Sequence, residues 1–131
     1  MSRIFKHKIK VYYEDTDLGG VVYHANYLKF LERARTEMIH SFDLTNKKLL
    51  QEHKILIVVK SCDIKFIKPA NIEDELQIYS LIELFTKASF TMNQKIKRND
   101  ELISEAKIHL VTVNSKGVPT KIPTILLKNF K

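Results

Sequence analysis

The sequence has 131 residues, which suits one domain of ordinary size built around one hydrophobic core. Hydrophobic residues make up 44% of it and charged residues 28%, and these proportions argue against disorder as its main state. The net charge of +7 would suit an anionic partner, but the lysines are scattered, so charge alone does not separate a binding site from a solvated surface. We expect a single domain over residues 1–131.

No segment of the sequence predicts membrane insertion or export. The longest apolar run, Ile55–Val59, is far too short to cross a bilayer. Residues 1–8 contain neither the apolar core nor the small-residue cleavage site of a signal peptide. We therefore expect a cytoplasmic protein.

The single cysteine, Cys62, stands in an apolar, alternating stretch. One thiol can form neither an internal disulfide nor a multi-cysteine zinc site. Its surroundings favour a small buried core residue over a nucleophile.

The first predicted element is a half-buried strand over residues 5–13, where apolar residues alternate with lysines. Its inward side comprises Phe5, His7, Ile9, Val11 and Tyr13. The polar stretch 14–20 ends the strand.

A long helix is predicted next, because apolar residues recur at three- and four-residue steps. They are Tyr27, Leu31, Ala34, Met38 and Phe42. The apolar face is wide, so we expect the helix to be largely enclosed. Asn26 or a residue just before it would cap the start, and the helix would end near Asp43. Thr45 would cap a second, short helix through Leu50.

The rest of the sequence predicts four strands, over residues 55–66, 76–84, 90–96 and 103–113, with a hairpin turn at 98–101 and a short amphipathic tail. An antiparallel sheet needs cover for its apolar face, and only one long helix is available. We therefore expect an α+β fold, a curved five-stranded antiparallel sheet wrapped around one long central helix. One helix cannot hide such a sheet completely, so self-association should bury an exposed edge or face.

Residues 11–27 combine acids, glycines and a histidine where the first strand gives way to the helix. Gly19 and Gly20 allow positive φ and close approach by a ligand, and a helix start offers unpaired N–H groups and a positive dipole end. A carboxylate placed before such donors suits hydrolysis, because the carboxylate can attack or activate water while the N–H groups polarise a carbonyl. The same residue types are also ordinary in loops and caps, and His24 alone could be a structural histidine, so both interpretations stay open.

Residues 12–28, YYEDTDLGGVVYHANYL, and 30–37, FLERARTE, resemble the signature of the 4-hydroxybenzoyl-CoA thioesterase family. The motif is most similar to the Tol-Pal-associated (YbgC-type) bacterial acyl-CoA thioesterases, and length and element order agree over nearly the whole chain. The resemblance implies the hotdog fold. It also implies hydrolysis of acyl-CoA, or of acyl-carrier-protein thioesters, to free acid and thiol.

In that family the second aspartate of the D-x-D motif is the catalytic carboxylate, and that position is Asp17 here. The resemblance implies that Asp17 attacks the thioester carbon, giving a mixed anhydride, or acts as a base toward water. The backbone N–H of His24, at the opening of the helix, would receive the oxyanion. The motif leaves the role of the imidazole open. Leu18 departs from the smaller residue that is common in relatives and would narrow the acyl pocket.

Other carboxylates compete with this assignment. Asp15 is the nearest rival, two residues earlier on the same loop. Glu32 and Glu37 lie on the helix, where a second branch of hotdog thioesterases carries its carboxylate. We interpret both glutamates as solvated or paired with Arg33 and Arg35.

Other kinds of site are disfavoured. Glu14, Asp15 and Asp17 lack the full oxygen set of a calcium loop, and Gly19-Gly20 is not followed by Gly-Lys-Ser/Thr. Most aromatic residues fall on core positions, so nucleic-acid stacking is a distant alternative. A non-catalytic or dehydratase-like hotdog acyl-binding protein is nearer, although the histidine-proline-glycine segment usual in dehydratases is absent. We expect no metal, no other cofactor and no nucleic-acid partner.

The resemblance also implies an acyl-CoA substrate and a dimer, or a tetramer built from dimers, with each active site at the dimer interface. The basic surface would suit the CoA phosphates or an acidic carrier protein. The sequence does not specify the preferred acyl length, the phosphate-binding residues or an envelope partner.

Overall fold

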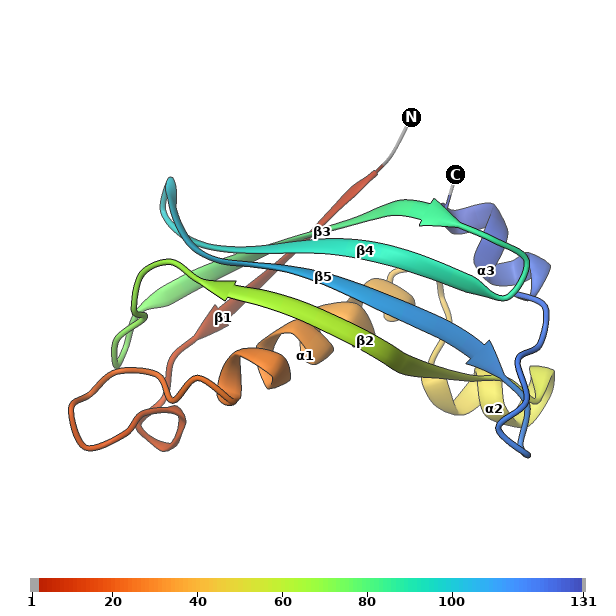
Figure 1. Ribbon diagram of the computed structural model, residues 1–131, viewed down its shortest axis with the longest axis horizontal. Coiled ribbons are helices and arrows are strands. Elements are labelled where there is room, and N and C mark those ends of the chain that lie inside the picture. Colours follow the sequence, from red (N-terminus) through yellow and green to blue (C-terminus); the bar gives the residue numbers. More distant parts are fainter. Residues whose placement is uncertain (1–2, 131) are drawn as a thin grey trace.

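The computed structural model describes residues 3–130 (Figure 1). The elements, in chain order, are β1 (Ile4–Lys10), a 3-10 turn (Tyr13–Asp15), α1 (Asn26–His40), α2 (Asn46–His53), β2 (Leu56–Phe66), β3 (Glu75–Phe85), β4 (Ser89–Arg98), β5 (Glu101–Val113) and α3 (Thr124–Phe130). The strands form one antiparallel sheet in the order β1-β3-β4-β5-β2.

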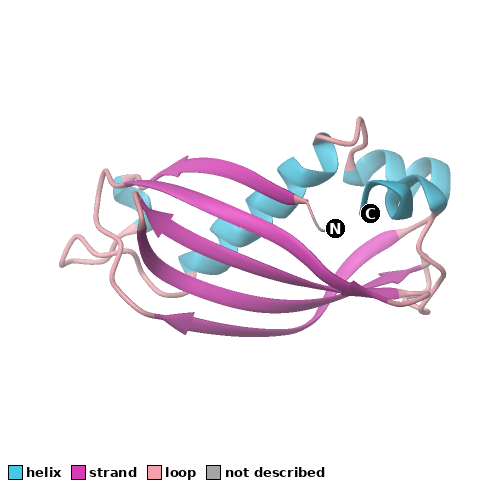
Figure 2. Cartoon of the chain, turned by 90° about the horizontal axis from the view of Figure 1, so that it is seen from above, coloured by secondary structure: helices cyan, strands magenta, loops and turns pink. Residues whose placement is uncertain are grey.

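The sheet curves over α1, which runs beneath it, while α2 and α3 lie at one end (Figures 1 and 2). Phe30 and Leu31 of α1 are buried in the same apolar cluster as Ile78, Met92 and Ile108 from the central strands. This burial is the main source of stability for such a layer of one sheet and one helix. The predicted hotdog arrangement, a curved five-stranded antiparallel sheet around a central helix, is confirmed.

A buried glutamine fixes α1 against the sheet. The amide of Gln94 on β4 is fully buried and donates to the carbonyl oxygen of Leu31 (3.1 Å) and to Ser80 Oγ (2.9 Å). Its Oε1 accepts a hydrogen bond from Arg35 Nη1 at 3.0 Å. A buried amide is costly unless its hydrogen bonds are made, so this network specifies how α1 sits on β3 and β4.

Strand β2 is one of the two edge strands of the sheet and pairs on one side with β5. Its register sets Val59, Cys62 and Phe66 opposite inward-facing residues of β5, yet Val59 is 50% exposed and Phe66 49%. Cys62 is exposed, so the prediction of a buried core cysteine is wrong. The apolar pattern was read correctly as a strand, but a pattern does not reveal that the strand lies at an uncovered edge.

Several boundaries differ from the predicted ones. β1 ends at Lys10 rather than at Tyr13, whose side chain is 79% exposed, because the chain turns into the 3-10 segment. α1 ends at His40, and Thr45 caps α2 by accepting from the backbone N–H of Lys48, as predicted for a second helix. The tail after Pro123 forms the helix α3.

Candidate active site

Asp17 lies in a short hairpin between β1 and α1. Thr16 and Val22 form an antiparallel bridge, and the backbone N–H of Asp17 donates to the carbonyl of Val21 at 2.9 Å. The turn closes through the N–H of Gly20, which donates to the Asp17 carbonyl at 3.1 Å, and Gly20 adopts φ +76°, which favours glycine. Asp17 Oδ1 accepts the N–H of Gly19 at 2.9 Å, and its side chain is exposed.

The hairpin is attached to the segment before β3 by backbone hydrogen bonds. The N–H of Val22 donates to the carbonyl of Ala70 at 2.8 Å, and the N–H of Ile72 donates to the carbonyl of Gly20 at 2.9 Å. Leu18 lies at the tip, fully exposed, and lines neither of the two cavities described below. The narrowing of an acyl pocket by Leu18 therefore stays a prediction.

The neighbouring acid, Asp15, has a structural role. It is 8% exposed, and its carboxylate accepts the backbone N–H of Tyr12 at 2.9 Å. Its carbonyl accepts from the N–H of Tyr23 (3.1 Å) and from Asn26 Nδ2 (2.9 Å), which ties the loop to the start of α1. Asp15 is thus occupied and enclosed, whereas Asp17 faces solvent.

His24 lies in the turn just before α1, two residues earlier than the first helical residue, Asn26. The backbone N–H of Asn26 donates to the carbonyl oxygen of Tyr23 (2.8 Å), and that of Tyr27 donates to the carbonyl oxygen of His24 (3.3 Å). The turn therefore continues directly into the helix. Within residues 3–130, the N–H groups of His24 and Ala25 have no acceptor. They are free donors at the positive end of a fifteen-residue helix.

The ring of His24 borders an open hollow of about 280 Å³. Its ring centre lies 4.5 Å from that of Tyr23 and 6.1 Å from that of Phe66. The hollow is lined by Val22, His24, Tyr27, Phe66, Ile67, Lys68 and Pro69. Asp17 is not among these residues, so one chain does not bring the two predicted site residues into one pocket.

An ion-pair cluster supports the segment on which the hairpin rests. Arg98 donates to Asp74 (2.7 Å), to Glu101 (2.6 Å) and to the carbonyl of Pro69 (3.1 Å), and Lys68 pairs with the same Glu101. The hydrogen bonds from Lys68 and Arg98 lower the pKa of the Glu101 carboxyl. The cluster thereby joins the start of β5 to residues 68–74.

Glu101→Gln is expected to lower Tm at neutral pH, with the difference from the parent protein vanishing in acid. A carboxyl whose pKa is lowered by folding stabilises the fold above its ordinary pKa of 4.5, and this contribution is lost as the pH falls through the lowered value. Thermal unfolding across acid and neutral pH measures this. Glu52→Gln, at an exposed site on α2, is the control, and an equal Tm for both variants at neutral pH would contradict the prediction.

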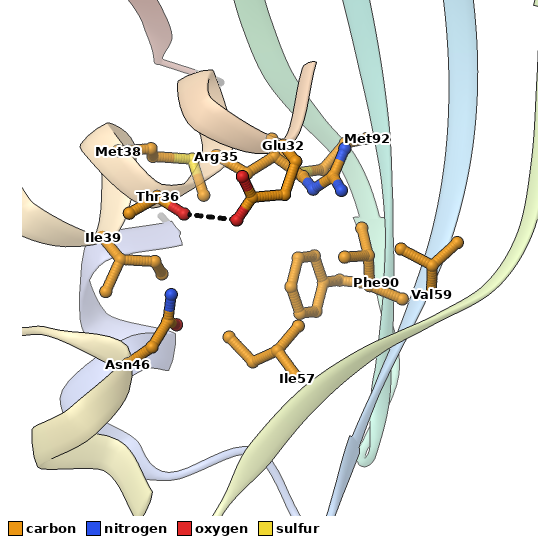
Figure 3. A pocket seen from close by; sticks show the side chains of 11 residues that line it. Glu32, Arg35, Thr36, Met38, Ile39, Asn46, Ile57, Val59, Phe90 and Met92 are labelled. Atoms are coloured by element: carbon orange, nitrogen blue, oxygen red, sulfur yellow. Dashed lines mark hydrogen bonds between the residues drawn. The ribbon is translucent and has the colours of Figure 1, made fainter. Parts of the chain in front are cut away.

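A second cavity, of about 160 Å³, lies between the C-terminal half of α1 and β2 (Figure 3). Its apolar lining comprises Met38, Ile39, Ile57, Val59, Phe90, Met92 and Leu110, and its polar lining comprises Glu32, Arg35, Thr36 and Asn46. Burial lowers the pKa of the Arg35 guanidinium, and nearby Glu32 partly offsets this.

Both helix glutamates are exposed, which agrees with the predicted solvated side chains rather than with pairing to an arginine. Glu32 accepts a hydrogen bond from Thr36 at 2.9 Å (Figure 3), and Glu37 lies 3.8 Å from His40 Nδ1, so neither is hydrogen bonded to an arginine. The cavity was not predicted from the sequence. The available signal was the spacing of residues 32, 35, 36 and 39, which share one helix face that is only partly apolar.

Between residues 3 and 130, no three His, Cys, Asp or Glu side chains are grouped so that they could hold a metal ion. In the same range, every helix is too short or too polar to span a membrane.

Known proteins resemble the chain over almost its full length. A sequence model of the thioesterase-like superfamily matches residues 11–130. The chain is 38% identical over 120 residues to the acyl-CoA thioesterase YbgC of Haemophilus influenzae, covering 91% of this chain and 88% of that one. It is 36% identical over 132 residues to the acyl-CoA thioester hydrolase YbgC of Escherichia coli, covering 99% and 98%.

A solved structure agrees with these relatives. The crystal structure of a probable thioesterase from Bartonella henselae is 33% identical and has a TM-score of 0.89, covering 92% of this chain and all of that one. The matched region includes the hairpin, the turn at His24 and the whole of α1. The resemblance seen in the loop motif is thereby confirmed, and the chain belongs to the thioesterase-like superfamily.

Proposed function

We propose that this protein hydrolyses acyl-CoA thioesters, with Asp17 as the catalytic carboxylate and the backbone N–H of His24 as the oxyanion donor. One observation carries the proposal: a hairpin attached by its backbone presents an exposed carboxylate directly before the free N–H groups at the start of α1. The relatives named acyl-CoA thioesterase and acyl-CoA thioester hydrolase support the same reaction.

The two groups divide the chemistry. The Gly19 N–H holds Asp17 Oδ1, which orients the carboxylate and leaves Oδ2 for the substrate. Oδ2 attacks the thioester carbon and the C–S bond breaks, giving a mixed anhydride and a CoA thiolate, and water then releases the acid. In the alternative route, Asp17 removes a proton from water, which attacks the same carbon. In both routes negative charge develops on the carbonyl oxygen, where the His24 N–H stabilises it.

A second copy of the chain completes this site. Asp17 is exposed and lies outside the hollow at His24, so one chain alone does not exclude water from the reaction. Strand β2 offers an open edge with partly exposed apolar residues, including Val59 and Phe66, as expected of a surface that pairs with a copy of itself. We infer a dimer through β2, with a tetramer of two such dimers as the larger assembly.

The surroundings of the site suit an anionic substrate. Lys68 lies beside the hollow at His24, and the chain carries a net charge of +7. The CoA phosphates, or the acidic surface of an acyl carrier protein, would be attracted by this charge. A cytoplasmic location follows from the same proposal, since CoA thioesters are made and used there.

Release of free thiol from acyl-CoAs, followed with a thiol reagent, tests the proposal. We expect turnover with at least some members of a series of short, long and aromatic acyl groups, because the site acts on the thioester that they share. Acyl-carrier-protein thioesters measured in parallel decide between the two carriers. Binding of acyl-CoA without thiol release from any member would instead favour the non-catalytic acyl-binding protein.

A further inference from the structure

The cavity between α1 and β2 has no role in the chemistry described so far. It lies against the C-terminal half of α1, from Glu32 to Ile39, whereas the hollow at His24 lies at the start of that helix. The cavity meets β2 at Ile57 and Val59, and the hollow meets the other end of the same strand at Phe66. The two spaces therefore occupy opposite ends of one edge strand.

In the dimer proposed above, a two-fold axis through the middle of β2 would bring these two spaces together. When two copies of an edge strand pair antiparallel about their centre, near Ser61, the Phe66 end of one copy lies beside the Leu56 end of the other. The hollow at His24 in one copy then faces the cavity at Ile57 and Val59 of the second copy. A thioester held at His24 would extend its acyl group into that cavity.

The size of the cavity limits what it can hold. An engineered apolar cavity of about 150 Å³ in another protein binds benzene, and this cavity has about the same volume, 160 Å³. Seven of its eleven lining residues are apolar, which suits an alkyl or aromatic group. About six carbon atoms would fill it.

The polar side of the cavity is held in place. Arg35 is bonded to Gln94, whose buried amide is itself anchored to Leu31 and Ser80, so the guanidinium cannot swing away without breaking a buried network. Glu32 stands beside it, bonded to Thr36 (Figure 3). A methylene pressed against these charged groups would remove their remaining water without replacing its hydrogen bonds, which is costly.

We propose that Arg35, held by Gln94, ends the acyl chamber that a second copy supplies to each active site, and so limits the acyl group to about six carbon atoms. This assignment rests on the proposed function. It makes Arg35 a specificity-determining residue, remote from the reacting atoms. The guanidinium and the Glu32 carboxylate balance each other's charge. The end of the chamber therefore rejects longer alkyl chains, and it does not attract acyl groups that carry a terminal carboxylate.

The test is kcat/KM for straight-chain acyl-CoAs from acetyl to palmitoyl. For the parent protein we expect a rise of up to about fourfold per methylene as far as hexanoyl, then a fall of about tenfold or more by decanoyl. Arg35→Met keeps the length of the side chain but removes its charge, and should raise the decanoyl-to-hexanoyl ratio about tenfold. Activity on acetyl-CoA should stay the same, since an acetyl group does not reach Arg35.

Arg33→Met is the matched control, because it removes the same charge from an exposed position on the same helix and should leave the length profile unchanged. Should Arg35→Met fail to fold, Arg35→Gln removes the charge, keeps a donor for Gln94 and should give the same direction of change. A parent profile that peaks at palmitoyl, or a profile unaltered in the Arg35 variants, would overturn the assignment while leaving thioester hydrolysis intact. A parent protein inert toward every acyl-CoA would instead refute the proposed function.

Discussion

Asp17→Asn is expected to lower kcat by about a thousandfold, within the usual range of about 10²–10⁴ for removing a general base. The amide has the shape of the carboxylate and keeps an oxygen to accept the Gly19 N–H, so the hairpin should keep its geometry. It lacks the negative charge that nucleophilic attack or proton removal requires. Steady-state turnover with the best acyl-CoA, beside Tm and circular dichroism of both proteins, measures the effect.

Two companion variants make this result specific. Asp15→Ala should act on stability, costing about 1–3 kcal/mol, because it leaves the backbone N–H of Tyr12 without its partner. His24→Ala should lose about tenfold or less in kcat, since the backbone N–H is retained. An inactive but stable Asp15→Ala protein together with an active Asp17→Asn protein would reverse the assignment of the two acids.

Cys62→Lys is expected to convert the proposed dimer into monomers and to reduce turnover about a hundredfold, because each site would lose the wall supplied by the other copy. Cys62 lies near the middle of the free edge strand. Desolvation raises the pKa of its thiol and the nearby Arg35 partly offsets this, so the sulfur lies within the field of that guanidinium. A lysine there would add a positive charge beside Arg35 and beside its own copy across the axis.

Light scattering measures the outcome directly, as a mass of 15.3 kDa for the variant against at least twice that for the parent protein. Leu84→Lys is the control, since it adds the same charge at an exposed position of β3, which two strands separate from β2. A Cys62→Lys protein that keeps both its assembly and its turnover would remove the support for pairing through β2.

The fold was largely predictable from the sequence because periodicity reports directly on which face of an element is covered. The helix from Tyr27 onward, the four later strands and the Thr45 cap all follow from apolar spacing and cap chemistry. The position of β2 in the sheet does not, because strand order depends on long-range pairing that leaves no local pattern. This is why Cys62, in a convincing apolar stretch, was wrongly expected to be buried.

The candidate site was predictable only in part. The D-x-D motif indicated both acids, but their opposite environments arise from three partners of Asp15, namely Tyr12, Tyr23 and Asn26. The contact with Tyr12 has the three-residue spacing of a helix cap, whereas no spacing rule anticipates the contacts with Tyr23 and Asn26. The Arg35–Gln94 pair joins residues far apart in the sequence, and each reads by itself as an ordinary polar residue on a helix or a strand.

The attachment of the 16–22 hairpin to residues 70–72 has a consequence for how this fold can be altered. Both contacts join main-chain atoms, Val22 to Ala70 and Ile72 to Gly20, so they are independent of the side chains at those positions. The side chains of this seam that lie outside the core, at Val21, Asn71 and Ile72, can therefore be exchanged with little displacement of the carboxylate at Asp17. A library randomised at these three positions would vary the surface beside Asp17 on a constant catalytic frame. Such a division between a main-chain frame and a variable surface is what makes a scaffold adaptable to new thioesters.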